Sequence, residues 1–179
     1  MDAVGASRIT KADNRMRLSP ALGPDSDWKN VLQGCRTVVH TAARVHVMKD
    51  ASSDPIMEFH MVNTEGTLNL ARQAFLAGVQ RFVFISSIKV LGEKTVSGLP
   101  FFAHQQPNPR DPYGISKRNA EDGLCALSKE TGMEVVIIRP PLVYGPGVKA
   151  NVLAMMHWLS RGIPLPFGSI TENRRSLVS

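Results

Sequence analysis

Residues 81–86 read Arg-Phe-Val-Phe-Ile-Ser, a short run of aromatic and β-branched residues. Two similar apolar runs occupy residues 37–40 and 134–139. Runs that are apolar throughout, rather than alternating apolar and polar, are typical of strands buried on both faces of a parallel sheet. We therefore predict three such strands at these positions.

Helical patterns lie between the predicted strands. Residues 55–77 carry apolar side chains at roughly helical spacing. Asp111 and Pro112 provide an N-cap and a first helical residue for a second helix, which ends at Gly132. Strands that alternate with helices form a parallel sheet with right-handed crossovers. The sequence thus predicts an α/β fold with a partial doubly wound sheet in β-α-β-α-β order, followed by a helix at 151–160.

The composition is that of a folded protein. The chain has 179 residues, of which 43% are hydrophobic and 20% charged, which excludes disorder and a collagen-like repeat. No apolar run approaches the roughly 18 residues that a membrane span needs, and residues 1–30 lack the apolar centre of a signal peptide. Cys35 and Cys125 match no metal-ligand or redox spacing. We expect a soluble, cytoplasmic protein without a metal site.

The formal net charge of +6 does not indicate nucleic-acid binding. The basic residues form no run longer than Arg174-Arg175, and only 6% of the residues are aromatic. Stacking surfaces interleaved with basic residues are therefore lacking. A small positive site for a phosphorylated molecule remains compatible with this charge.

The spacing Tyr113-Gly-Ile-Ser-Lys117 puts a phenol and an ammonium on one face of the second predicted helix. A phenol with a pKa near 10 is a poor base, but a neighbouring cation lowers its pKa, so the pair could exchange a proton with an alcohol or ketone. The same spacing also describes a surface tyrosine and lysine. Ser87 follows the strand at 81–86, at the edge where α/β sheets place ligands; its hydroxyl could hold a substrate oxygen or simply bond its own turn.

Small and unusual residues accompany the first strand and the first helix. Ala42 and Ala43 follow the strand at 37–40, where small side chains let a flat ligand approach the backbone or let a helix pack closely. Asn63 and Gly66 lie within the first predicted helix, although asparagine and glycine are both disfavoured in helix interiors. Their presence indicates that each faces a group that lies close to the helix.

Five of these segments resemble those of the extended short-chain dehydrogenase/reductases, in order and in spacing. They are 39–43 (VHTAA), 63–67 (NTEGT), 84–87 (FISS), 111–117 (DPYGISK) and 139–146 (RPPLVYGP). From about Trp28 onward the chain resembles the NAD-dependent nucleotide-sugar epimerases and dehydratases, typified by UDP-galactose 4-epimerase. Within them it looks most like bacterial members that act on UDP-N-acetylquinovosamine-type sugars.

The resemblance implies a Rossmann-like fold, hydride transfer at a carbon of a UDP-sugar, and NAD or NADP as cofactor. Tyr113 would be the acid/base, Lys117 would bind the nicotinamide ribose, and Ser87 would hold a sugar hydroxyl. The other residues implied to touch the cofactor are Ala42, Ala43, Arg44, Asn63, Pro140, Pro141 and Leu142. Asn151 and Arg175 match positions that contact the nucleotide-sugar diphosphate, for which a guanidinium is well suited.

The resemblance also implies missing parts. Family members begin with a strand and a GxxGxxG turn that holds the cofactor pyrophosphate, and residues 1–34 contain neither a buried apolar run nor this turn. We therefore expect a chain cut at both ends with reduced cofactor affinity. Its expected parts are a poorly defined segment at 1–34, a partial NAD-binding domain at 35–148, and the start of a substrate-binding region at 149–179.

Two alternatives to an active enzyme remain: a catalytically inactive truncated remnant, and a non-catalytic binding module of the same fold. Relatives commonly form dimers through the helices that correspond to 55–77 and 111–131. The apolar stripes on these helices could equally belong to the core.

Overall fold

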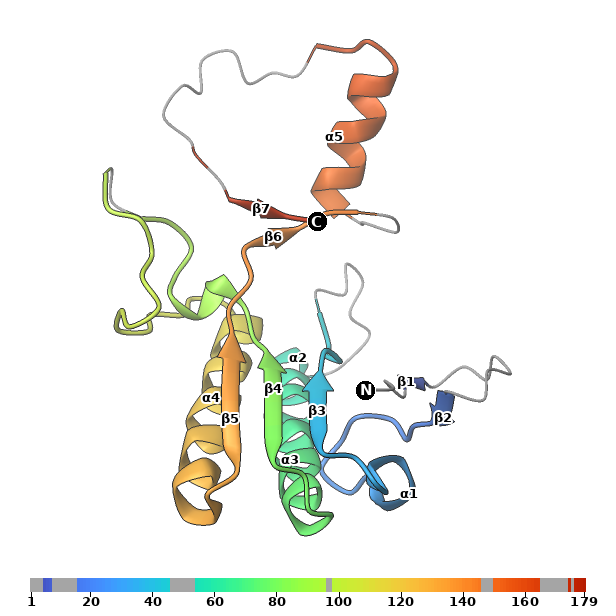
Figure 1. Ribbon diagram of the computed structural model, residues 1–179. Helices are drawn as coiled ribbons and strands as arrows, with labels where there is room; N and C mark the ends of the chain where they lie inside the picture. The colour runs from blue at the N-terminus through green and yellow to red at the C-terminus, as the bar shows by residue number, and fades with distance from the viewer. Residues whose placement is uncertain are drawn as a thin grey trace. The chain divides into compact units, whose positions relative to one another are not determined.

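The computed structural model describes residues 5–7, 16–45, 54–95, 98–145, 150–164, 174 and 176–179. The chain divides into two compact units, Met1–Arg139 and Pro140–Ser179. Figure 1 shows the elements of both units, which we describe separately.

A parallel three-stranded sheet forms the centre of the first unit. Its strands are β3 (Thr37–His40), β4 (Arg81–Ile85) and β5 (Glu134–Ile138), in the order β3-β4-β5. The register pairs Val39 with Val83 and Val83 with Val136. The predicted strands and their parallel arrangement are confirmed.

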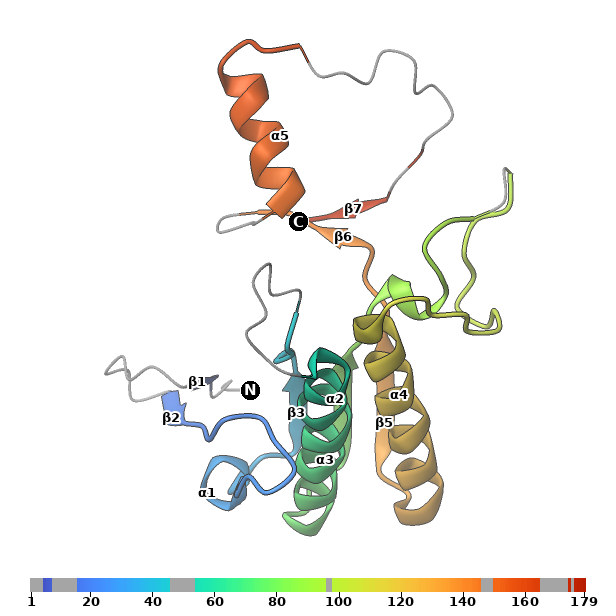
Figure 2. The same ribbon diagram turned by 180° about the vertical axis from the view of Figure 1, so that it is seen from behind.

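The helices of this unit lie on one face of the sheet (Figures 1 and 2). They are α2 (Pro55–Phe59), η1 (His60–Glu65), α3 (Gly66–Leu76) and α4 (Pro112–Thr131). Successive right-handed crossovers in one direction put both connections on the same side. Side chains of the other face are exposed, Val39 by 60% and Ile138 by 45%. Our prediction that the strands are buried on both faces is therefore wrong.

The core lies between this sheet and the helices. Phe82 and Phe84 of β4 are fully buried, together with Leu124 of α4. A short helix, α1 (Lys29–Leu32), adds Leu32 to the same cluster, as does Trp28 directly before it.

The N-terminal segment, for which we expected no buried strand, contains two short strands. Strand β1 (Gly5–Ser7) pairs in parallel with β2 (Met16–Leu18) as a separate two-stranded sheet. These strands have no apolar run in the sequence, because three-residue strands can pair through their backbones alone. Leu18 is indeed 65% exposed.

The predicted helix at 55–77 is confirmed, with one irregularity. Asp54 caps its start by accepting a hydrogen bond from the Met57 amide, and the six residues of η1 form a π-helical segment in its middle. Such segments occur frequently at functional sites. Gly66 follows directly, and a Cβ there would lie 2.9 Å from the backbone nitrogen of Gly23. This close approach explains the glycine.

The second unit has a parallel pair of two-residue strands, β6 (Leu142–Val143) and β7 (Leu177–Val178), and the helix α5 (Ala150–Ser160). The predicted helix at 151–160 is confirmed. Among the described residues, no helix is both long and apolar enough to cross a membrane.

Candidate functional site

The predicted catalytic residues gather at the carboxyl end of β4. Ser87 follows this strand and caps the short 3₁₀ helix η2 (Ile88–Val90), because its Oγ accepts a hydrogen bond from the Lys89 amide at 3.2 Å. The first turn of α4, which carries Tyr113, packs against η2, because a Cβ on Gly114 would lie 3.1 Å from the Lys89 carbonyl oxygen. The structure therefore brings Ser87 and Tyr113 together across two elements, as we predicted from the sequence.

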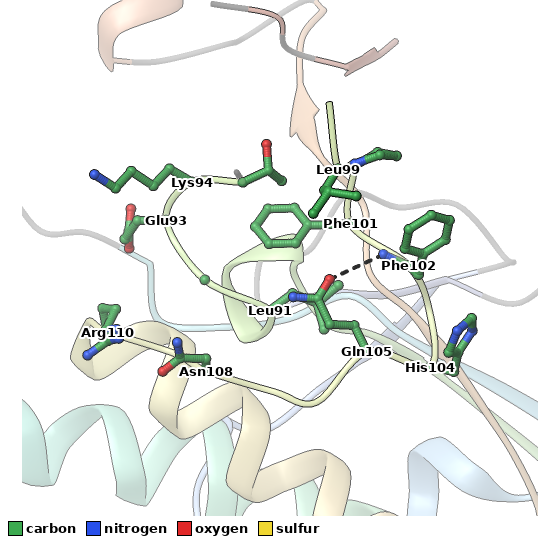
Figure 3. A pocket seen from close by; sticks show the side chains of 13 residues that line it. Leu91, Glu93, Lys94, Leu99, Phe101, Phe102, His104, Gln105, Asn108 and Arg110 are labelled. Atoms are coloured by element: carbon green, nitrogen blue, oxygen red, sulfur yellow. Dashed lines mark hydrogen bonds between the residues drawn. The ribbon is translucent and has the colours of Figure 1, made fainter. Parts of the chain in front are cut away.

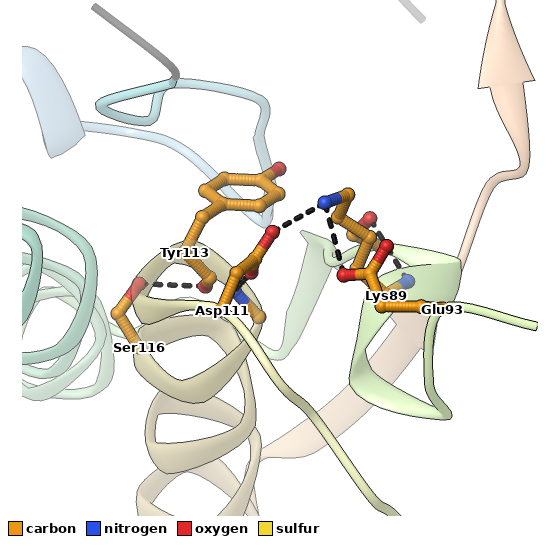
Figure 4. Close-up of polar contacts among 7 residues, drawn as sticks. Lys89, Glu93, Asp111, Tyr113 and Ser116 are labelled. Carbon is orange, nitrogen blue, oxygen red and sulfur yellow. Dashed lines mark hydrogen bonds and ion pairs between the residues drawn. The ribbon is translucent and has the colours of Figure 1, made fainter.

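Tyr113 lies in the first turn of α4, which Asp111 fixes. The Oδ1 atom of Asp111 accepts a hydrogen bond from the Gly114 amide at 2.6 Å, and its Oδ2 atom pairs with the Lys89 ammonium (Figure 4). Burial raises the pKa of Tyr113 most strongly. The Ser87 side chain lowers this pKa, the Asp111 charge raises it and the Lys89 charge lowers it. The net effect is a raised pKa, which leaves the phenol protonated at neutral pH.

Lys117 lies one turn further along α4 and is almost fully buried. Its Nζ donates a hydrogen bond to the Ile85 carbonyl at 2.9 Å and lies 4.4 Å from the centre of the Phe84 ring. Burial lowers its pKa to about 8, against the opposing charge of Glu121. Lys117 is not among the groups that lower the pKa of Tyr113, and Lys89 is. The Lys117 ammonium is held by the end of β4, and its role toward the phenol stays a prediction.

Asn63 connects three parts of the site. Its Oδ1 accepts from the Arg44 amide at 2.8 Å, and its Nδ2 donates to the Arg44 carbonyl and to Ser116 Oγ, each at 3.0 Å. Ser116 Oγ in turn donates to the Tyr113 carbonyl at 2.8 Å. Thr64 adds a hydrogen bond to the Ser116 carbonyl. The π-helical segment thus fixes both the segment after β3 and the first turn of α4.

A buried ion pair between Glu121 and Arg139 was missed by the sequence reasoning. Glu121 is 1% exposed, and the Arg139 guanidinium donates to both of its carboxylate oxygens, at 2.9 and 2.6 Å. Ser86 Oγ donates to the same carboxylate at 2.6 Å. The available signal was the spacing of four between Lys117 and Glu121, which puts both on the buried face of α4.

His40, at the end of β3, is a second buried polar residue near this edge. Its Nε2 lies 2.9 Å from Thr67 Oγ1, and its ring stacks on that of Phe84. Burial, and secondarily the Lys117 charge, lower its pKa to about 3, so the ring is neutral at physiological pH. It acts as a packed hydrogen-bonding group.

A hollow of ≈ 740 Å³ is formed by the loop between η2 and α4. Figure 3 shows its apolar wall, with Leu91, Leu99, Phe101 and Phe102, and the polar side chains around it. Its lining includes neither Ser87 nor Tyr113. The hollow is therefore separate from the catalytic candidates.

The remaining predicted residues fall into two groups. Ala42, Ala43 and Arg44 follow β3, with Ala42 exposed and the Arg44 guanidinium 5.7 Å from the Phe59 ring centre. The others belong to the second unit or lie outside the described residues, so their roles stay predictions. The second unit begins with Pro140, Pro141 and Leu142. Asn151 belongs to α5, but the structure does not describe its side chain. Arg175 lies outside the described residues.

A parallel sheet with a serine, a tyrosine and a lysine at its carboxyl edge defines an α/β protein of the Rossmann type. Comparison with known proteins gives the particular family. The chain matches the NAD-dependent epimerase/dehydratase family over residues 4–174, and it belongs to that family. The match includes β1 and β2, so our expectation that the resemblance starts near Trp28 is wrong.

Individual relatives agree with this assignment. The chain is 55% identical over 171 residues to a UDP-glucose 4-epimerase from Vibrio cholerae, covering 96% of this chain and 52% of that protein. A dTDP-glucose 4,6-dehydratase from Streptomyces venezuelae, solved with bound NAD, superposes with a TM-score of 0.73 at 28% identity, covering 93% of this chain and 52% of that one. A Pseudomonas aeruginosa protein, RMD, solved with NADPH, superposes with a TM-score of 0.66 at 27% identity, covering 86% and 55%. The chain spans about half the length of these relatives.

Proposed function

We propose that this chain carries the catalytic core of an NAD- or NADP-dependent enzyme that transfers hydride at a carbon of a UDP-sugar, with Tyr113 as acid/base. The observation that carries the proposal is the packing of η2, which Ser87 caps at the carboxyl end of β4, against the first turn of α4, which carries Tyr113. Ligands of open α/β sheets bind at this edge. The similarity to a UDP-glucose 4-epimerase supports the substrate class.

The residues at this edge fit a nicotinamide cofactor by their chemistry. Ala42 and Ala43 after β3 leave the backbone accessible, and the hydroxyl of Tyr113 and the ammonium of Lys117 are donors suited to ribose hydroxyls. We propose that these residues and Arg44 hold the nicotinamide half of the molecule. When bound, NAD or NADP supplies the hydride acceptor.

The chain's own residues would handle the proton. Oxidation of a secondary alcohol releases the hydroxyl proton while hydride leaves the carbon, and a phenolate at Tyr113 would accept that proton. Ser87 Oγ would hold the sugar oxygen by a hydrogen bond. Asn63 acts indirectly, because it fixes Ser116 and thereby the turn that carries Tyr113.

Two further parts of the proposal concern partners. We propose that Asn151 and Arg175 bind the diphosphate of the nucleotide sugar.

We also propose that the chain forms a homodimer through α2 to α3 and α4. Apolar side chains remain exposed on these helices, namely Ile56, Met57, Met61 and Ile115. Dimer formation predicts twice the monomer mass in sedimentation equilibrium, and charged substitutions of Met57 and Ile115 should reduce that mass.

Binding of NADH to the purified chain tests the function directly. Enhanced nicotinamide fluorescence should show binding to the parent chain and weaker binding to a Lys117→Met variant. A Tyr113→Phe variant should still bind NADH, somewhat more weakly than the parent, but lose at least a hundredfold in sugar oxidation, since general acid/base groups contribute roughly 10²- to 10⁴-fold.

An exposed position on the same helix supplies the control. Lys129 lies in the last turn of α4, and Lys129→Met should alter neither binding nor turnover. Failure of the parent chain to bind NADH or NADPH at millimolar concentration would contradict the proposal and favour the inactive remnant.

A further inference from the structure

The buried carboxylate of Glu121 joins the two elements that carry the proposed catalytic residues. Glu121 belongs to α4, the helix whose first turn carries Tyr113, and it is 1% exposed. Its Oε1 atom accepts a hydrogen bond from Ser86 Oγ at 2.6 Å. Because Ser86 directly precedes Ser87, this hydrogen bond ties the end of β4 to the helix that carries Tyr113.

Ser86 is held from two sides. Its amide donates a hydrogen bond to the Ile138 carbonyl of β5 at 2.7 Å, while its hydroxyl donates to Glu121. The residue is 3% exposed, so water has little access to either bond. Ser87 follows with an extended backbone and caps η2. The direction in which the chain leaves the sheet toward Ser87 therefore depends on these two hydrogen bonds.

The guanidinium of Arg139, directly after β5, holds the Glu121 carboxylate in place. Its Nε donates to Glu121 Oε1 at 2.9 Å, and its Nη2 donates to Oε2 at 2.6 Å. Its Nη1 donates to the Ala103 carbonyl, in the loop after η2, at 2.8 Å. Arg139 and Ala103 also line a small hollow of ≈ 370 Å³ together with Ile88 of η2. Contacts of one ion pair thus flank η2, at Ser86 before it and at Ala103 after it.

We propose that Glu121 is a positioning residue that fixes Ser87 relative to Tyr113 through its hydrogen bond with Ser86, and that Arg139 orients the Glu121 carboxylate. The inference rests on the proposed roles of Ser87 and Tyr113. A misplacement of about 1 Å in a catalytic arrangement can cost roughly a hundredfold in rate. The hydrogen bond between Ser86 and Glu121 should therefore affect turnover although neither residue acts on the substrate itself.

Two double variants isolate the hydrogen bond that Ser86 donates. Glu121→Gln with Arg139→Met keeps an amide oxygen that can accept this bond, whereas Glu121→Leu with Arg139→Met removes the acceptor. Both variants lose the whole ion pair, so neither leaves an unpaired buried charge. Both also lack the Glu121 charge, which raises the pKa of Lys117 against its burial. A difference between the glutamine and leucine variants therefore reports the acceptor for Ser86.

Amide hydrogen exchange of residues 87–92, followed by mass spectrometry, reports the placement of Ser87 without cofactor or substrate. The Lys89 amide donates to Ser87 Oγ, and the Val90 amide donates to the Ser87 carbonyl. These amides should exchange roughly fivefold faster in the leucine variant, the size expected for one lost hydrogen bond, while the amides of β3 exchange equally in both variants. With UDP-glucose as substrate, kcat of the leucine variant should be at least about tenfold lower, at equal affinity for NADH.

Two single variants complete the test. Arg118 Nη1 lies 3.8 Å from Glu121 Oε2, and Arg118→Met should leave exchange and turnover at the parent level. Ser86→Ala removes the donor but keeps the ion pair, and it should reproduce the leucine variant. If far-ultraviolet circular dichroism shows that the leucine variant does not fold, Ser86→Ala replaces it and is compared with the parent.

The outcomes separate this inference from the proposed function. Equal exchange at residues 87–92 in folded glutamine and leucine variants, or equal kcat in active ones, overturns the positioning role of Glu121. Failure of the parent chain to bind NADH contradicts the proposed function, and the exchange comparison still decides whether Glu121 places Ser87.

Discussion

Replacing Lys117 by methionine should stabilise the fold. The ammonium is 2% exposed, and its pKa falls from 10.5 to about 8 because burial disfavours the charged form. At about 1.4 kcal/mol per pH unit, this corresponds to roughly 3 kcal/mol of unfavourable burial at neutral pH. Methionine fills a similar volume without charge but gives up the hydrogen bond to the Ile85 carbonyl, at a cost of about 1 kcal/mol. We expect Lys117→Met to raise the free energy of unfolding by about 2 kcal/mol.

The pH dependence supplies the stricter test of this reasoning. Between pH 8 and 10.5 the unfolded chain keeps a proton on Lys117 that the folded chain has released, so the parent protein should gain stability relative to the variant as the pH rises. Urea denaturation of both proteins from pH 7 to 10.5 measures the difference. Lys129→Met, on the exposed end of α4, should change the unfolding free energy by less than about 0.5 kcal/mol. A stability difference between Lys117→Met and the parent that stays constant from pH 7 to 10.5 would refute the burial argument.

Two other substitutions test the polar framework around the site. Asn63→Ala removes the three hydrogen bonds of a buried side chain and should lower the free energy of unfolding in urea by about 2–4 kcal/mol. Alanine at the exposed Asn119 should change this free energy by less than about 0.5 kcal/mol. Because the pKa of His40 falls from 6.5 to about 3, the folded state resists its protonation, and stability should be lost as the pH drops below 6.5, by up to about 1.4 kcal/mol per pH unit. His40→Gln should flatten this dependence of the unfolding free energy on acid pH relative to the parent. An unchanged slope would show that other groups cause the dependence. The same substitution at the exposed His157 serves as the control.

The sequence predicted the framework of the fold because its signals are local. The apolar runs at the three strands, the cap at Asp111 and the glycine at 132 each act within a few residues, and the structure places β3, β4, β5 and α4 accordingly. Parallel order then follows from the alternation of strands and helices. The placement of Ser87 and Tyr113 at one edge was predictable for the same reason, since Ser87 follows β4 and the helix that returns to the next parallel strand begins at the same edge of the sheet.

Side-chain partners between distant elements were not predictable in this way. Glu121 and Arg139 lie on a helix and after a strand, and nothing in either local sequence indicates the other. The π-helical segment at 60–65 depends on how Asn63 and Thr64 reach Arg44 and Ser116, which spacing cannot specify. The hydrogen bond from Lys117 to the Ile85 carbonyl was not predictable either, because helical spacing gives the face on which a residue lies and not the contact of its long side chain.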